Sequence, residues 1–117
     1  MLSDIPEIDS SELAKRMNAK NPPCLLDVRE PWELELAKLS YPNLVNLPMS
    51  VLAVDQFEAF PAEFGDKNVE IIVFCHHGVR SASVTQWMMR GGWRNILSLR
   101  GGIDAFAAEV DPSIGFY

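Results

Sequence analysis

The chain has 117 residues, 48% of them hydrophobic and 22% charged, and this balance is ordinary for one globular domain spanning residues 1–117. The net charge of -6 and a pI of about 4.8 argue against binding to nucleic acid or to anionic membranes, which requires a basic face. The sequence shows no signal peptide and no membrane span, and its two cysteines favour reduced thiols in a cytoplasmic protein over a disulfide scaffold.

The first part of the chain predicts three strands and two helices. Residues 7–8 are a weak strand candidate, and the capping box that begins at Asp9 predicts the start of a helix. The apolar run 24–28, which follows two prolines, predicts a buried strand. A proline in the first turn supports a helix over residues 30–34, and a third strand is expected at 44–47.

The middle of the chain contains the clearest strand and the clearest helix. Ser50 is expected to cap a helix over residues 51–60, which a proline ends. The β-branched run 69–74 predicts a central strand. Ser81 is expected to open a helix over residues 81–90, whose apolar side chains fall on one side and which ends at a Gly-Gly pair.

The last part of the chain completes an alternating order of strands and helices. A fifth strand is expected at 95–99 and a last helix over 103–110. This alternation predicts an α/β fold with a mostly parallel five-stranded sheet and helices on both faces. Ligands bind such sheets outside the carboxyl ends of the strands. Cys75, Arg29 and Arg100 each follow a predicted strand, so they are expected at one edge.

The segment from Cys75 to Arg80 reads CHHGVR and joins the predicted central strand to the helix after it. A turn of this kind directs backbone N–H groups inward, and the helix adds its positive end. Gly78 suits a turn that needs positive φ or close approach to a ligand. The inward N–H groups and the positive end of the helix both favour the thiolate of Cys75, which is the nucleophilic form. The guanidinium of Arg80 suits an oxyanion.

Four motifs in the same order give the chain a resemblance to the single-domain rhodaneses, a sulfurtransferase family. CLLDVRE resembles the aspartate–arginine end of a family strand, with Asp27 and Arg29 in place. VNLP resembles the segment before the central helix, and CHHGVRS resembles the six-residue loop that runs from cysteine to arginine. GGWRNILSLRGGIDAF resembles the glycine-rich closing motif. The resemblance covers nearly the whole chain.

This resemblance implies a rhodanese-like fold and a persulfide chemistry without a cofactor. Cys75 would take sulfur from a small anionic donor such as thiosulfate and pass it to a thiol, to cyanide or to a protein acceptor. Arg80 would turn toward acidic partners and shape the loop, and Asp27 would order the loop region by hydrogen bonds. The implied site residues are Cys75 as the nucleophile, His76, His77, Gly78, Val79 and Arg80 as the anion-binding loop, and Asp27, Arg29 and Ser81 as supporting residues.

The other residues that could carry chemistry have simpler interpretations. His76 and His77 beside Cys75 are not expected to bind a metal, because three consecutive ligands in a tight loop cannot easily point at one ion. The imidazoles either attract an anionic donor when protonated or are exposed loop residues without a role. Cys24 begins one strand whereas Cys75 follows another, so Cys24 is expected in the core rather than as a resolving thiol.

Four functions are compatible with the loop. The first two are a thiosulfate-type sulfurtransferase and a persulfide relay between partner proteins. The third is a cysteine phosphatase or arsenate reductase, but phosphatases of that kind have one more residue between cysteine and arginine. The fourth is an inactive interaction module, and the presence of Cys75 argues against it. We expect sulfur transfer.

Overall fold

A computed structural model describes residues 5–117 and contains one parallel sheet in the strand order β1-β5-β4-β2-β3. The α/β class and the five expected strands are confirmed. The strands are β1 (Glu7–Ile8), β2 (Cys24–Asp27), β3 (Leu44–Asn46), β4 (Ile71–Phe74) and β5 (Ile96–Leu99).

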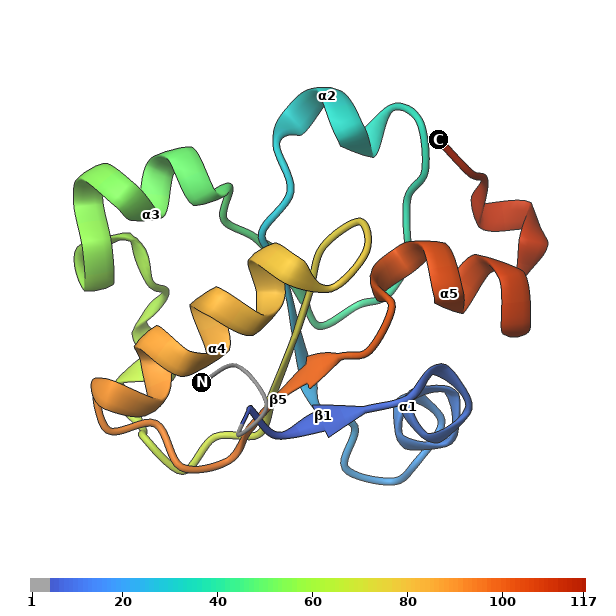
Figure 1. Cartoon of the computed structure of the whole chain (residues 1–117). Coiled ribbons are helices and arrows are strands. Elements are labelled where there is room, and N and C mark those ends of the chain that lie inside the picture. The colour runs from blue at the N-terminus through green and yellow to red at the C-terminus, as the bar shows by residue number, and fades with distance from the viewer. Residues whose placement is uncertain (1–4) are drawn as a thin grey trace.

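Helices cover both faces of this sheet (Figure 1). The α-helices are α1 (Ser10–Met17), α2 (Pro31–Leu34), α3 (Met49–Asp55), α4 (Val79–Arg90) and α5 (Gly102–Glu109). Short 3-10 helices follow at Gln56–Ala59, Ala62–Gly65 and Pro112–Ile114. Within residues 5–117, no helix is long and apolar enough to cross a membrane.

Side chains that alternate along the central strands form two apolar layers. On one face, Leu26 and Val73 pack with Val84 of α4. On the other face, Leu25 and Ile72 pack with helices α1 and α5. Because both faces of β2 and β4 are covered, these strands are apolar at nearly every position, as buried parallel strands usually are.

Helix α4 begins two residues earlier than the sequence predicts. Gly78 is its N-cap with a φ of 105°, and the amide of Ala82 donates to the Gly78 carbonyl at 3.1 Å. A left-handed glycine turns the chain sharply enough for the helix to begin at once. Ser81 therefore lies in the first turn of α4 rather than before it, with its amide directed at the turn.

Helix α3 is shorter than predicted, and Ser50 does not cap it. The helix begins after Pro48, and the hydroxyl of Ser50 donates instead to Oε1 of Glu30 at 2.6 Å. It ends at Asp55, because Gln56 takes a positive φ of 52° and starts a 3-10 turn. The contact between Ser50 and Glu30 joins α3 to the N-terminus of α2.

The register of the sheet places the ends of its central strands side by side. Asp27 pairs with Phe74 across β2 and β4, and the amide of Val28 donates to the Phe74 carbonyl at 3.1 Å. Cys75, directly after Phe74, and Arg29, two residues after Asp27, thus lie at the carboxyl edge of the sheet, where ligands of open parallel sheets bind.

Candidate active site

Two backbone amides hold the sulfur of Cys75. Sγ lies 3.1 Å from the amide nitrogen of Gly78 and 3.3 Å from that of Ser81, and both donate to it. These amides belong to the N-terminal end of α4, where the helix dipole is positive. Cys75 is only 1% exposed, so water screens this interaction poorly. The arrangement favours negative charge on the sulfur without a cationic side chain.

The hydroxyl of Ser81 fixes the turn around the sulfur. It donates to the Gly78 carbonyl at 3.2 Å and lies 3.5 Å from Cys75 Sγ, which donates to it as a thiol. It also pairs with the hydroxyl of Ser98 on β5 at 2.8 Å, and both serines are fully buried. Sequence reasoning missed Ser98, because a serine inside an apolar strand gives no sign of its partner.

The glycine-rich turn after β5 supports the backbone of the loop. The amide of Ile103 donates to the Cys75 carbonyl at 2.8 Å, and the amide of Asp104 donates to the His76 carbonyl at 3.1 Å. Gly102 has a φ of 65°, and a Cβ at this position would collide with both carbonyls. The loop therefore lies against the N-terminus of α5 at a distance that only glycine permits.

Arg80 binds Glu33 of α2. Its Nη1 and Nη2 donate to the two carboxylate oxygens at 2.7 Å each. The bonds from Arg80 hold the pKa of Glu33 at about 2, although burial of this carboxyl opposes the shift. Sequence reasoning missed Glu33. Its position three residues after Glu30 was a signal, since its carboxylate accepts from the Glu30 amide at 2.8 Å.

Asp27 and Arg29 form a second, fully buried ion pair. The Nε and Nη2 of Arg29 donate to the Asp27 carboxylate at 3.0 and 2.9 Å. Burial opposes the charge of Arg29, but its hydrogen bonds to Asp27 and Tyr117 outweigh burial and raise the pKa of the guanidinium. Nη1 donates to the Ala37 carbonyl at 2.8 Å, so the pair orders the segment after α2. Because Arg29 is fully buried, its guanidinium does not face a substrate.

The rings of His76 and His77 are stacked, with centroids 3.8 Å apart and planes 25° from each other. With Asp104 they form a group whose potential ligand atoms lie within 4.8 Å of one another. Nearly parallel rings direct their in-plane lone pairs side by side rather than at one point, so this arrangement does not suit a shared metal ion. Burial, followed by the nearby His77, lowers the pKa of His76, which works against its attracting an anion at neutral pH.

Two residues of this edge turn outward. Val79 is 70% exposed, so it contributes its backbone to the loop and its side chain to the surface. Arg100 follows β5 at the expected edge, but its side chain is 63% exposed and its Nε lies 3.3 Å from Oε1 of Glu7. The guanidinium of Arg100 therefore contributes nothing to the sulfur site, whereas the glycines that follow it support the loop.

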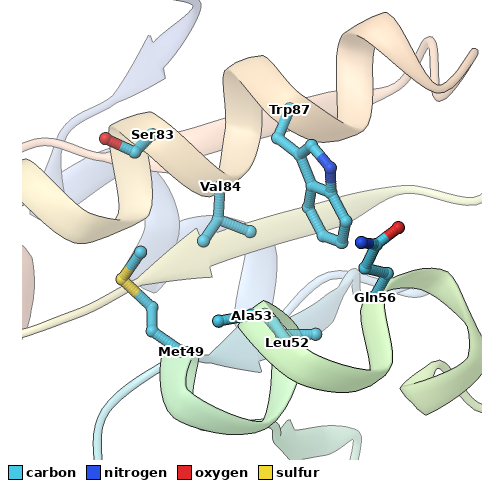
Figure 2. Close-up of a pocket in the computed structure, with 7 residues that line it drawn as sticks. All are labelled: Met49, Leu52, Ala53, Gln56, Ser83, Val84 and Trp87. Atoms are coloured by element: carbon cyan, nitrogen blue, oxygen red, sulfur yellow. The ribbon is translucent and has the colours of Figure 1, made fainter.

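A groove of about 300 Å³ lies between α3 and α4 (Figure 2). Figure 2 shows Val84 and Trp87 projecting from α4 toward Leu52 and Ala53 of α3. None of residues 75–80 lines this groove, although Val84 and Leu52 belong to the same apolar layer as Cys75. It is an apolar surface beside the site rather than the site itself, and sequence reasoning did not predict it.

The order of these elements and the sequence of the loop match a known protein family. The model of the Rhodanese-like domain matches residues 9–109, which include Asp27, Arg29, the loop and the glycine-rich turn. The chain belongs to the rhodanese-like domain family. The recognition made from the sequence motifs is thus confirmed.

Curated relatives place this rhodanese-like domain among sulfurtransferases. A "Sulfurtransferase" of Allochromatium vinosum is 31% identical over 110 residues, which cover 94% of this chain and 95% of that protein. An "Adenylyltransferase and sulfurtransferase MOCS3" of Drosophila willistoni is 36% identical over 98 residues, which cover 82% of this chain but only 21% of the relative. The domain therefore occurs in known proteins both nearly alone and as a small part of longer chains.

Solved structures agree with the fold. A rhodanese-related protein from Thermoplasma volcanium superposes with a TM-score of 0.71 at 30% identity, covering 90% of this chain and 93% of that one. A protein from Staphylococcus saprophyticus has a TM-score of 0.72 at 27% identity, covering 91% and 97% of the two chains. The α/β arrangement is thus the family's own.

Proposed function

We propose that this protein transfers sulfur by forming a persulfide on Cys75. The observation that carries the proposal is the sulfur position itself, where two amides at the start of α4 donate to Sγ. Backbone donors of this kind stabilise a thiolate before the reaction and remain in place while charge moves between sulfur atoms. They also need no reorientation, because Gly102 and the Ser81–Ser98 pair hold the loop in place.

The proposed reaction has two balanced steps. The Cys75 thiolate attacks the outer sulfur of a donor such as thiosulfate, a bond forms between the two sulfurs, and sulfite leaves with the electron pair of the broken bond. A thiol, cyanide or protein thiolate then attacks the outer sulfur of the persulfide and restores the Cys75 thiolate. No net oxidation of the protein occurs, and no cofactor is needed by this scheme.

A relay of persulfide sulfur between partner proteins is the second candidate. It is favoured because the arginine side chains near the loop are already paired with carboxylates. Arg80 is bound to Glu33, Arg29 is bound to Asp27, and the pKa of His76 is lowered by burial. An anionic donor would thus rely on backbone amides alone. A persulfide carried by a partner brings less charge to the loop. We place either activity in a reducing compartment such as the cytoplasm, where both cysteines stay reduced.

Intact mass spectrometry after mixing with thiosulfate tests the proposal. The wild-type protein and Cys24→Ser should each gain one sulfur atom, because the buried Cys24 takes no part. Cys75→Ser should gain none while keeping its circular dichroism spectrum. A parallel sample is mixed with a small persulfide donor instead of thiosulfate. Sulfur uptake from the persulfide donor but not from thiosulfate would favour the relay over the thiosulfate enzyme. Failure of the wild type with both donors, or hydrolysis of an aryl phosphate that depends on Cys75, would refute sulfur transfer.

A further inference from the structure

The last residue of this sequence lies against the loop that carries Cys75. The ring of Tyr117 stacks on the imidazole of His76, with centroids 3.7 Å apart and planes 7° from each other. Figure 1 shows the chain turning back after α5 so that its C-terminal end lies near α2. Gly115, with a φ of 104°, allows this return, because a Cβ there would lie 2.9 Å from the Leu36 carbonyl oxygen.

The hydroxyl of Tyr117 makes a second set of contacts, with the charged residues behind the loop. It donates to Oε1 of Glu33 at 2.8 Å and accepts from Nη1 of Arg29 at 3.2 Å. The same oxygen of Glu33 accepts from Nη2 of Arg80 at 2.7 Å. Tyr117 thus joins the buried Asp27–Arg29 pair to the Glu33–Arg80 pair.

These contacts reach both ends of the six-residue loop. The stacked ring touches His76, the second residue, and the hydroxyl acts through Glu33 on Arg80, the sixth. The stack covers one face of the His76 ring, and Nε2 of this imidazole is buried. The amide donors to Cys75 Sγ come from Gly78 and Ser81, which lie within or just beyond this held segment.

We propose that Tyr117 is a positioning residue for sulfur transfer, which holds both ends of the Cys75–Arg80 loop so that its amides stay aimed at the sulfur. The proposal rests on the proposed function, since it assigns a role in that reaction. Preorganised donors lose effect steeply when they are displaced, and a shift of about 1 Å in a reacting group can cost on the order of a hundredfold in rate.

Two substitutions separate the ring from the hydroxyl. Tyr117→Leu keeps an apolar side chain but removes both contacts, and we expect kcat/KM for sulfur loading of Cys75 to fall roughly tenfold. Tyr117→Phe keeps the stack and loses only the hydrogen bonds, so a fall of about threefold is expected. Phe116→Leu is the matched control, because Phe116 is 55% exposed and makes none of the site contacts described here.

A double substitution and a titration distinguish positioning from loss of stability. His76→Ala with Tyr117→Leu should be no slower than the slower single variant, because both remove the same stack. Burial lowers the pKa of His76, so NMR titration should show this pKa rising toward the ordinary value of about 6.5 in Tyr117→Leu but not in Phe116→Leu. Thermal unfolding measured alongside shows whether each variant is folded.

Sulfur loading at the wild-type rate in folded Tyr117→Leu, or an unchanged pKa of His76, would overturn the proposal. If Tyr117→Leu does not fold, sulfur loading at the wild-type rate in Tyr117→Phe would overturn it instead. If even the wild type takes up no sulfur, the proposed function fails. The rate of Cys75 alkylation by iodoacetamide in the same variants then tests independently whether Tyr117 positions the loop. A rate in Tyr117→Leu that differs from wild type supports this role, and an equal rate refutes it.

Discussion

The two cysteines of this chain occupy opposite ends of neighbouring strands and have different surroundings. Cys24 begins β2 inside the apolar layer, where burial and then the nearby Glu63 raise the pKa of its thiol to about 11. Cys75 follows β4 and receives two N–H donors at its sulfur. The reactive form of a cysteine is the thiolate, so we expect position in the sheet to decide which thiol reacts.

Alkylation should distinguish the two thiols at neutral pH. We expect iodoacetamide to modify Cys75 in the folded protein and to leave Cys24 unmodified, because a thiol with a pKa of about 11 carries almost no thiolate there. Peptide mapping by mass spectrometry after graded exposure measures both sites. Both should react once the chain is unfolded in urea, and equal modification in the folded protein would contradict the assignment.

At the scale of elements, the loop depends on close contact with the N-terminus of α5. Gly102→Ala should lower the free energy of unfolding by about 2 kcal/mol or more, since the new Cβ meets two backbone carbonyls and the φ is positive. Sulfur loading of Cys75 should fall with it, because the loop must move. Urea unfolding and intact mass measure the two effects.

Gly65→Ala is the control for this substitution. No atom lies within 4 Å of the position its Cβ would take, so its free energy of unfolding should stay within about 0.5 kcal/mol of wild type. Equal stability of the two alanine variants would show that the loop and α5 are not in the close contact described above.

At the scale of the whole molecule, the ion pair of Glu33 and Arg80 makes the stability of the folded protein depend on pH. The folded pKa of Glu33 is about 2, below its ordinary value of 4.5, so the pair stabilises the protein fully above pH 4.5. This contribution is lost as the pH falls from 4.5 through 2. The lowered pKa corresponds to a contribution on the order of 2 kcal/mol, after a reduction because water partly screens the half-buried Arg80.

Glu33→Gln tests this contribution. At pH 7 the variant should unfold with a free energy lower by about 2 kcal/mol, and the difference from wild type should shrink as the pH approaches 2. Urea unfolding curves at several pH values measure both. Asp66→Asn, in a surface turn, is a suitable control and should follow wild type. A difference that stays constant with pH would show that the carboxylate does not act by its charge.

The sequence by itself determined the order of the elements and the place of Cys75, the proposed nucleophile, at the end of a strand. Apolar runs and turn residues are local signals, and a strand that runs directly into Cys75, Gly78 and a helix predicts a turn suited to an anion without any distant contact. The alternation of strands and helices then required a parallel sheet, which brought Arg29 and Cys75 to one edge.

Only the tertiary structure decided which side chains serve that edge. Glu33, Ser98 and Tyr117 lie 47, 17 and 88 residues from their respective partners Arg80, Ser81 and Arg29, and no local pattern marks contacts at such separations. Arg100 shows the reverse, since its place after β5 was predicted correctly but its side chain turns to Glu7. Position along a strand fixes which edge a residue reaches, whereas the direction of its side chain depends on charges that folding brings alongside it.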